Sequence, residues 1–347
     1  MNKNKRPTIA TVAQQAQLSV ATVDRVLNAR APVNTQTAER VFQAAEAVGY
    51  YAARLIAERI REKKPGYHFG ILLLGTSLEF YGHLRDAIRE QARLFTEANI
   101  ICHDDAIIDR SPHAVARQIE QLAEQCDCLA LVCFEHPVIH QAIERVRSRG
   151  IQIVSLLSDL SSESHRPYVG TDNVEVGRTA GWLMAHTCHP PQGSVAVILG
   201  GHRFVGHEKR EQGLRSYFEE KAPGFRLLEP IINMDNADVT EEATLELLAR
   251  HRDLRGLYIA GGGVEGVLSA LALTPERPPL CVIVQESTQA SRHALRQGLI
   301  RLVIDSQPTV LAKELIALMV KLQTAETFDP VQQRIFVPLQ VLTPENI

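Results

Sequence analysis

Strand-length apolar runs alternate with amphipathic helices along most of this chain. The predicted strands cover residues 69–74, 99–103, 129–134, 151–156, 194–199, 227–233, 255–260, 280–284 and 301–305. The predicted helices between and after them cover about 80–97, 112–125, 137–149, 173–188, 205–221, 239–251, 264–273, 287–297 and 309–323. Continuous apolar strands in this arrangement are typical of parallel sheets covered on both faces. We expect two α/β lobes with a cleft between them, because so many strands exceed one ordinary sheet.

The composition fits a soluble globular protein of two or three domains. The chain has 347 residues, of which 45% are hydrophobic and 22% charged. No apolar run approaches the roughly 20 residues that cross a bilayer. The basic N-terminus lacks the apolar core of a secretory signal, and six cysteines are too few for a disulfide framework. We therefore expect a cytoplasmic protein with no membrane partner.

Charge is distributed unevenly along the chain. Residues 1–65 contain 11 Lys and Arg against 5 Asp and Glu, a net charge of +6. The rest of the chain has 26 against 35, a net charge of −9. A small basic segment on a large acidic one indicates that the small segment alone binds a polyanion such as nucleic acid.

The basic segment is predicted to form three short helices. Thr8 is a suitable N-cap for the first helix and Ser19 for a second helix over 20–27. Asn34 is suited to cap a third helix, which Gly49 ends. Two short helices joined by a tight turn, with a third packed on them, match the helix-turn-helix plan for DNA binding. A helical module that does not bind DNA would share the apolar pattern, and the basic charge favours DNA.

In the helix-turn-helix plan the second helix enters the major groove by its N-terminal end. Small side chains there allow close approach to base edges, and Arg25 can donate two hydrogen bonds to guanine. Hydroxyl groups at the helix ends can bind phosphates. The predicted contacts to double-stranded DNA are Thr8, Ser19, Val20, Ala21, Thr22, Arg25 and Asn28.

The segment from Thr8 to Asn28 reads TIATVAQQAQLSVATVDRVLN. It resembles the signature of the LacI/GalR (lac-repressor) family of bacterial transcription regulators. The resemblance implies that Val20 and Ala21 read bases, with Arg25 one turn later. Asp24 stands where the family usually has serine. Its carboxylate could repel phosphate or accept a hydrogen bond from cytosine N4.

In that family a short linker helix follows the head and inserts a leucine into the minor groove. The corresponding segment here is AARLIAERIRE, residues 52–62, in which Arg59 takes the leucine position and Leu55, Ile56 and Ile60 are nearby apolar candidates. An arginine can enter a narrow minor groove without unstacking bases, so we predict a weaker central kink in the bound DNA. We expect a head at 1–51, a linker at 52–66 and an effector-binding and dimerisation body at 67–347.

The body resembles the periplasmic-sugar-binding-protein fold that the family joins to its DNA-binding head. The resemblance implies a homodimer and a small-molecule effector, a sugar or sugar derivative, bound between two lobes. It also implies three crossings between the lobes, which we expect near 163–167, 286–298 and 324–330. The predicted fold is thus a three-helix head followed by a two-lobed α/β body with parallel sheets.

Ligands of such sheets bind beyond the carboxyl ends of the strands. The resemblance matches Arg210 to the family's sugar-contacting arginine and Glu286 to its acidic residue, whereas Tyr81 could instead be helix core. Arg210 could also be a surface ion-pair residue and Glu286 a helix cap. The predicted effector-binding residues are Phe80, Tyr81, Glu135, Asp159, Arg210, Glu286 and Ser306.

Two other functions remain open from the sequence. Gly261, Gly263 and Gly266 imitate a dinucleotide-binding fingerprint after a predicted strand, which would suit a nucleotide-binding enzyme or a phosphate-bearing effector. The run Gly261-Gly262-Gly263 also replaces the family's usual Asn-Asp, so an orphan regulator without an effector is the second alternative. The sequence contains no convincing catalytic or metal-binding spacing, so we predict no enzyme, no cofactor and no metal. We predict a repressor whose affinity for DNA is allosterically controlled.

Overall fold

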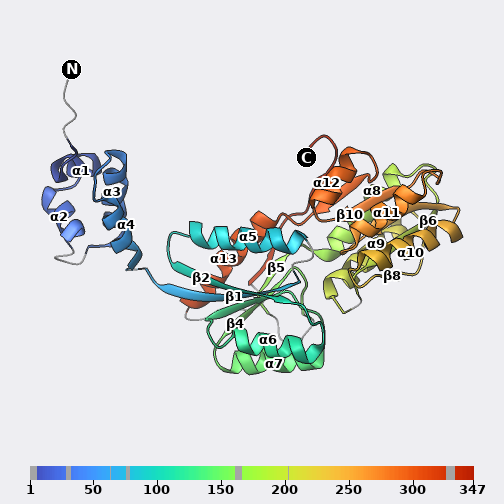
Figure 1. Ribbon diagram of the computed structural model, residues 1–347, viewed down its shortest axis with the longest axis horizontal. Helices are drawn as coiled ribbons and strands as arrows, with labels where there is room; N and C mark the ends of the chain where they lie inside the picture. Colours follow the sequence, from blue (N-terminus) through green and yellow to red (C-terminus); the bar gives the residue numbers. More distant parts are fainter. Residues whose placement is uncertain are drawn as a thin grey trace, which may run out of the picture. The chain divides into compact units, whose positions relative to one another are not determined.

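The computed structural model (Figure 1) describes residues 6–28, 33–62, 64–75, 79–160, 166–201, 203–325 and 333–347. The chain forms two compact units, which are described separately below. One unit contains residues 1–67 and 95–100, and the other contains residues 68–94 and 101–347.

The first unit contains the predicted three-helix head. Its helices are α1 (Ile9–Ala16), α2 (Val20–Asn28) and α3 (Thr35–Ala47). Thr8 caps α1 by accepting a hydrogen bond from the amide of Thr11, and Asn34 caps α3 by accepting from the amide of Thr37. The hydroxyl of Ser19 accepts from the amide of Thr22 at the start of α2. The predicted helix starts are therefore confirmed, because each cap satisfies an amide that has no partner within its helix.

A fourth helix, α4 (Ala53–Glu62), covers most of the predicted linker. Ile56 is fully buried and belongs to the same apolar core as Val12, Val23 and Val41. Leu55, the neighbouring residue, is 44% exposed. In this structure α4 is thus part of the folded head unit, and Ile56 contacts the head core instead of presenting its side chain to a DNA groove.

The second unit is built on two sheets that carry the predicted strands (Figure 1). The first sheet has the order β12-β5-β4-β3-β1-β2, with β1 (Gly66–Leu74), β2 (Asn99–Ile107), β3 (Cys128–Leu131), β4 (Gln152–Leu156), β5 (Tyr168–Gly170) and β12 (Arg334–Phe336). The second has the order β13-β11-β10-β9-β6-β7, with β6 (Gly193–Leu199), β7 (Phe225–Leu227), β9 (Leu254–Ile259), β10 (Cys281–Gln285), β11 (Leu302–Asp305) and β13 (Gln340–Leu342). The second sheet also contains the short strand β8 (Ile231–Ile232), which pairs with β6.

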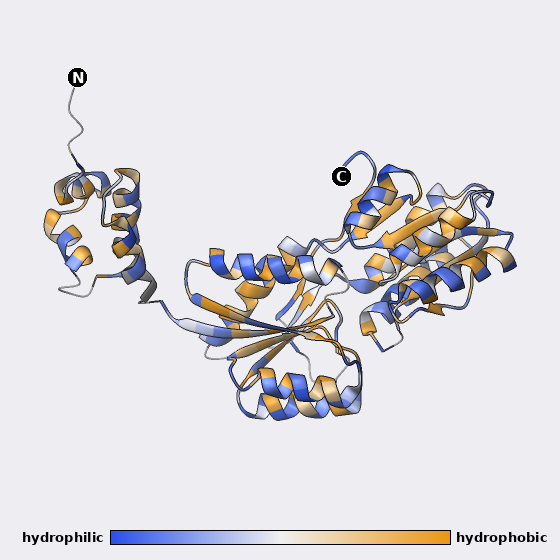
Figure 2. Cartoon of the chain, viewed as in Figure 1, coloured by the Kyte–Doolittle hydropathy of each residue, from blue (hydrophilic) through white to orange (hydrophobic). Residues whose placement is uncertain are grey.

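Helices cover both faces of the first sheet and form the first lobe with it. In Figure 1, α5 (Glu79–Leu94) and α13 (Pro308–Thr324) lie on one side of this sheet. On the other side lie α6 (Pro112–Leu122) and α7 (Pro137–Ser148). The strands of both sheets are mainly orange in Figure 2, whereas the helices carry both orange and blue residues. This is the pattern expected of buried parallel strands between amphipathic helices.

The second lobe shows how one strand supplies two cores. Val195, Val197 and Leu199 of β6 pack with α8 (Asn173–Thr187) and α9 (Val205–Lys221). The alternate residues Ala196 and Ile198 pack with α10 (Ala237–Arg250), α11 (Val264–Leu273) and α12 (Gln289–Arg296). Successive side chains of a strand point to opposite faces, so an uninterrupted apolar strand requires helices on both.

Two features of the body differ from the sequence predictions. The predicted strand 227–233 is divided into β7 and β8, with Pro230 between them, since proline cannot donate a ladder hydrogen bond. The prediction also omitted β5, which is only three residues long.

The three predicted crossings between the lobes, at 163–167, 286–298 and 324–330, were wrong in position. The strand β5 still belongs to the first sheet and α8 to the second lobe, so the first crossing lies at 171–172. The second lies at 306–307, between β11 and α13, because α12 packs in the second lobe. The third lies at 337–339, between β12 and β13. Residues 161–165 and 326–330 lie outside the described residues. The first and third crossings follow the three-residue strands β5 and β12. The second lies between a strand and a helix that were both predicted, so the apolar pattern located these elements but not the lobe to which α13 belongs.

Candidate functional site

The second helix of the head exposes a continuous polar and small-residue face. Val23, Val26 and Leu27 of α2 are buried against the other head helices. The predicted base-reading residues Val20 and Ala21 are exposed, as is Arg25 one turn later. This division follows the helical repeat and leaves the N-terminal part of α2 free to enter a groove.

The polar groups of this face bond within the helix. The side chain of Arg25 donates through Nε to the carbonyl of Ala21 at 3.3 Å. Asn28 donates to a carboxylate oxygen of Asp24 at 2.6 Å, and the hydroxyls of Ser19 and Thr22 lie 2.8 Å apart. The bond of Arg25 uses Nε alone, whereas the side-chain amide of Asn28 is already engaged by Asp24. Arg59 lies in α4, and its side chain is outside the described residues.

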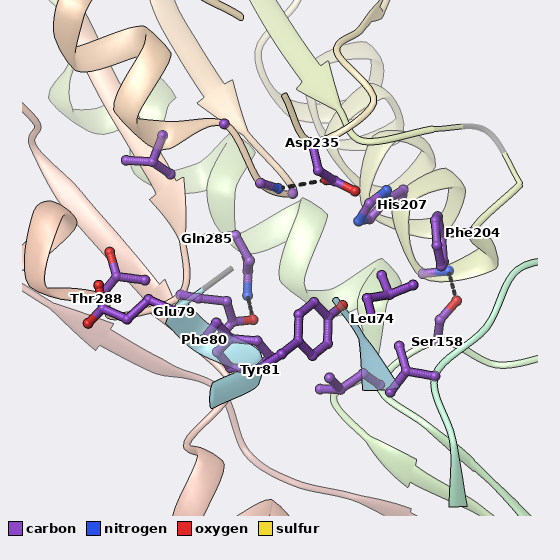
Figure 3. Close-up of a pocket in the computed structure, with 18 of the residues that line it drawn as sticks. Leu74, Glu79, Phe80, Tyr81, Ser158, Phe204, His207, Asp235, Gln285 and Thr288 are labelled. Carbon is purple, nitrogen blue, oxygen red and sulfur yellow. Dashed lines mark hydrogen bonds between the residues drawn. The ribbon is translucent and has the colours of Figure 1, made fainter. Parts of the chain in front are cut away.

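A cavity of about 100 Å³ lies between the two lobes of the body (Figure 3). The first lobe supplies Leu74, Val132 and Leu157, together with the side chains at the start of α5 and Ser158 after β4. The second lobe supplies groups that follow the carboxyl ends of its strands and the N-terminal turns of α9 and α11. The polar side chains that line it are Glu79, Tyr81, Ser158, His207, Arg210, Asp235, Glu265, Gln285, Glu286 and Thr288.

Four of the predicted effector-binding residues line this cavity: Phe80, Tyr81, Arg210 and Glu286. The rings of Phe80 and Tyr81 are arranged edge to face, with centroids 5.3 Å apart. Ser306 does not line the cavity, but its hydroxyl donates to Glu286 at 2.6 Å and its amide donates at 3.0 Å. Ser306 therefore orients the carboxylate of Glu286 from a position outside the cavity lining.

Two predicted residues lie elsewhere. Asp159 accepts a hydrogen bond from Arg334 at 2.6 Å and lines a separate hollow beside Tyr168. Glu135 contacts His140, with 2.6 Å between its carboxylate and Nε2. Neither lines the cavity between the lobes, so the structure does not support them as ligand contacts. Both follow first-lobe strands, but the carboxylate of Glu135 pairs with His140, and that of Asp159 pairs with Arg334 and, at 4.0 Å, with Lys209 of the second lobe.

Glu286 occupies a strained and electrostatically unusual position. Its φ of +70° is in the left-handed region, which costs a non-glycine residue energy and recurs at functional sites. Burial and the negative charge of Asp305 together raise the pKa of Glu286 to about 7, against the lowering effect of Arg210 and of the hydrogen bonds from Ser306. The carboxyl group can therefore act as a hydrogen-bond acceptor, or as a donor when protonated, near neutral pH.

The cationic and aromatic groups of the cavity are held by buried partners. Arg210 donates to Asn173 and to the carbonyl of Ala260, each at 2.7 Å. Burial and the charge of Arg210 lower the pKa of His207 to about 4, so this imidazole is neutral at pH 7. Burial also raises the pKa of Tyr81, whose hydroxyl remains protonated. The cavity therefore combines the neutral side chains of His207 and Tyr81 with the cation of Arg210 and several carboxyl groups.

Bonds between the two lobes surround the cavity. Arg110 of the first lobe donates to Asp235 of the second at 3.1 Å. The amide of Gln289, at the start of α12, donates to Glu79 at 2.8 Å, and the amide of Gly206 donates to Ser158 at 3.1 Å. The structure thus holds the lobes in a closed arrangement around the cavity.

Comparison with known proteins identifies both parts of the chain. Residues 8–52 match the family of bacterial regulatory proteins of the lacI type. Residues 69–327 match the periplasmic binding protein domain. The chain belongs to the LacI family of bacterial regulatory proteins. It is a DNA-binding transcriptional regulator with a ligand-binding body.

Relatives and solved structures agree with this membership. The HTH-type transcriptional regulator GalS of Salmonella typhimurium (strain LT2) is 27% identical over 270 residues, covering 76% of this chain and 75% of GalS. The ribose operon repressor of Halalkalibacterium halodurans is 25% identical over 274 residues, covering 78% of this chain and 77% of that protein. The fold of an ABC transporter solute binding protein from Burkholderia graminis, in complex with D-arabinose, matches with a TM-score of 0.73 at 19% identity, covering 81% of this chain and 96% of that one.

For this LacI-family regulator the glycine-rich segment has a structural explanation. The amide of Gly262 donates to Asp235 at 3.0 Å. A Cβ atom at Gly266 would lie 2.0 Å from the carbonyl of Ala237, so this glycine permits close packing of α11 on α10. An amide that a bound phosphate would need is thus taken by a carboxylate. Together with relatives that are transcription regulators and not enzymes, this argues against the dinucleotide-binding alternative.

Several cavity residues of the regulator were not predicted from the sequence. Asp235 follows the strand pair β7 and β8, and Ser158 directly precedes the predicted Asp159. Gln285 directly precedes Glu286 and accepts a hydrogen bond from Tyr258 at 2.9 Å. The rule that ligands bind beyond strand ends applies to all three, but which of two adjacent residues faces the cleft depends on how each strand ends.

The described residues show neither a membrane span nor a metal site. No helix among them is long and apolar enough to cross a bilayer. They also contain no group of three His, Cys, Asp or Glu side chains arranged to hold a metal ion.

Proposed function

We propose that this regulator is a repressor whose affinity for operator DNA is controlled by a neutral sugar or sugar derivative bound in the cavity between the lobes. The observation that carries the proposal is the lining of that cavity. It combines the carboxyl groups of Asp235 and Glu286, the guanidinium of Arg210 and the aromatic rings of Phe80 and Tyr81. Paired acceptors and donors beside an aromatic face suit a ring that bears several hydroxyl groups.

The charges of the cavity favour an uncharged ligand over a phosphorylated one. Glu79, Asp235, Glu265 and Glu286 line it together with one arginine, and Asp235 already accepts the amide of Gly262. A phosphate would be brought close to several carboxylates, which is unfavourable in a partly desolvated site. A neutral sugar is therefore favoured over the phosphate-bearing effector that the glycines alone suggested.

The control of DNA binding is proposed to operate by linkage. A ligand that contacts both lobes stabilises the arrangement in which Arg110 bonds to Asp235 and Glu79 bonds to Gln289. The heads of a homodimer are proposed to bind a two-fold operator better in one arrangement of the lobes than in a second one. A ligand that binds one of these arrangements more tightly then changes the affinity for DNA. A coupling of about 1–3 kcal/mol corresponds to a roughly 5–150-fold change.

A thermal-shift screen with D-ribose, D-arabinose and other pentoses and hexoses tests the proposal. Ligand at 100 times its dissociation constant adds about 2.7 kcal/mol of stability. A sugar that stabilises the chain should also change its affinity for a selected operator, measured by fluorescence anisotropy. Asp235→Asn should abolish both effects, because it removes an acceptor from the cavity.

Asp238→Asn is the matched control, since Asp238 is an exposed carboxylate at the start of α10 and does not line the cavity. Stabilisation that survives in Asp235→Asn would mean that the sugar binds elsewhere.

The second candidate function is an orphan regulator with no effector. The observation that favours it is that protein groups bridge the lobes directly, through the Arg110–Asp235 and Ser158–Gly206 bonds. An arrangement held closed by such bonds needs no ligand to bind DNA. This alternative is supported if no sugar stabilises the chain and Asp235→Asn alone changes operator affinity.

A further inference from the structure

A second and larger pocket lies at the opposite end of the second-lobe strands from the cleft. Its volume is about 480 Å³, against about 100 Å³ for the cavity between the lobes. Its walls come from the amino ends of β9, β10 and β11 and from the C-terminal end of α8. Arg255, Arg277 and Arg301 all line it. Neither an aspartate nor a glutamate is among the lining residues found in the described part of the chain.

The three arginines retain hydrogen-bonding capacity toward the pocket. Arg301 is exposed, and the described residues offer its side chain neither a hydrogen bond nor an ion pair. The Nε atom of Arg255 is buried without a hydrogen-bond partner among these residues, and its Nη1 reaches only the carbonyl of Leu254 at 3.3 Å. Arg277 bonds through Nη1 alone, to the carbonyls of Leu271 and Thr274. Buried donors without partners are costly, so a ligand that accepts from them is favoured.

We propose that this pocket binds a phosphorylated small molecule, as a second ligand site of the regulator. A guanidinium group donates two parallel hydrogen bonds to a phosphate, and the charge of three such groups exceeds its double negative charge. The volume exceeds that of a bare phosphate, and Pro278, Leu280 and Leu299 provide an apolar wall for a carbon skeleton. The occupant is therefore an organic phosphate monoester.

The pocket is separate from the cleft, although the same strands reach both. Along β10 the chain passes from Cys281 at the pocket to Glu286 at the cavity, and along β11 from Arg301 to Ser306, which supports Glu286. Five residues of extended chain span roughly 17 Å. The two sites can therefore be filled at the same time. The basic pocket favours an anionic ligand, whereas the acidic cleft favours a neutral one.

Isothermal titration of the full chain, at constant ionic strength, tests the proposal with three probes: inorganic phosphate, ribose 5-phosphate and adenosine monophosphate. Neutral ribose is the matched compound without charge. At least one organic phosphate should bind saturably and more tightly than inorganic phosphate. Arg301→Ala should weaken that binding about tenfold or more, as expected for loss of a charge-assisted contact. Arg255→Gln should weaken it similarly.

Arg296→Ala is the control, because Arg296 is an exposed arginine of the same lobe that does not line the pocket. Circular dichroism checks that each variant folds, and Arg301→Gln replaces Arg301→Ala if the latter does not. The proposal is wrong if none of the probes binds saturably at millimolar concentration, or if both pocket variants bind like the wild type. It is also wrong if Asp235→Asn removes the binding, which would assign the phosphate to the cleft. The first two outcomes leave the sugar proposed for the cleft untouched, whereas loss of binding in Asp235→Asn would contradict that proposal as well.

Discussion

The head and the cleft of this regulator carry their functional groups in opposite ways. On α2 the groups that face outward, Val20, Ala21 and Arg25, are exposed and lie within six consecutive residues. In the cleft, Arg210, Asp235 and Glu286 come from separate segments, and their polar atoms are tied to partners within the protein.

This difference has a consequence for stability. An exposed side chain on α2 can change with little cost to the fold, whereas a cleft side chain supports its neighbours as well as a ligand. In the head, a substitution can therefore change DNA binding without changing stability. In the cleft, a substitution that changes ligand binding is expected to change stability as well. Ile56 is the exception in the head, because it belongs to the linker helix and yet completes the head core.

Ile56→Ala should have the largest effect. Ile56 is fully buried in the head core although it lies in the linker helix α4. Deleting such a side chain costs about 2–5 kcal/mol, which is a large part of the stability of a small helical unit. Hydrogen exchange of residues 9–28 in the full chain should accelerate strongly, and DNA affinity should fall.

Leu55→Ala is the control, because Leu55 is 44% exposed, and its effect should be within about 0.5 kcal/mol. Equal effects of the two variants would show that α4 is not part of the head core.

Arg25→Ala should reduce operator affinity with no loss of fold. An arginine bound to a guanine edge contributes about 1–3 kcal/mol of discrimination. Fluorescence anisotropy should show weaker binding to a selected operator and a much smaller change for random DNA. Arg252→Ala, an exposed arginine of the body, should change neither. A uniform loss on both DNAs would instead indicate that Arg25 contacts phosphate.

Glu286→Gln should change the pH dependence of stability. Burial, with Asp305 nearby, raises the pKa of Glu286 from an ordinary 4.5 to about 7. The folded chain then keeps a proton that the unfolded chain has lost, so the free energy of unfolding falls as the pH rises from about 4.5 to about 7. The fall amounts to about 1–3 kcal/mol and ends above that window.

Urea unfolding between pH 4.5 and 8, followed by the fluorescence of the single tryptophan, Trp182, measures this slope. Glu286→Gln should make the slope shallower, and part of it should remain because the pKa of Asp305 is also raised, chiefly by burial. Glu242→Gln, an exposed carboxylate on α10, should leave the slope unchanged. An identical slope in Glu286→Gln would contradict the assignment.

Asp24→Ser should have the smallest effect. It removes a negative charge from the DNA-facing helix and frees Asn28, which now bonds to Asp24. Exposed charge interactions are worth about 0.2–1 kcal/mol, so affinity for operator and random DNA should both rise a few-fold. Asp24→Asn keeps the shape of the side chain and removes only its charge, so it distinguishes an effect of charge from an effect of size. A loss of affinity restricted to sites with a particular cytosine would show that Asp24 reads that base.

The sequence predicted the head closely because helix caps and buried residues there are local. Thr8, Ser19 and Asn34 each bond to an amide three residues away, and the apolar positions of α2 follow one helical repeat. In the body the same periodicity predicted most strands and helices. It did not predict the lobe crossings, since the lobe to which an element belongs depends on contacts such as the pairing of β12 with the distant strand β5.

The predictions for the cleft were likewise correct for some residues and wrong for others. Phe80, Tyr81, Arg210 and Glu286 were recognised from strand ends and from resemblance, and they line the cavity. Asp159 and Glu135 satisfied the same rule and yet bond to Arg334 and His140. Position at a strand end is a property of the chain, but the direction of a side chain there depends on which charged partner the packed lobe brings within reach.

The sequence by itself determined the class of each part: a basic helix-turn-helix head and an α/β body of covered parallel strands. These follow from local patterns of hydrophobicity, capping and charge. Only the tertiary structure decided that Ile56 completes the head core, that Asp235 faces the cleft, and that Arg255, Arg277 and Arg301 meet in one pocket. Each depends on contacts between segments far apart in the chain, where the packing of strands and helices, and not their sequence neighbours, sets which side chains meet.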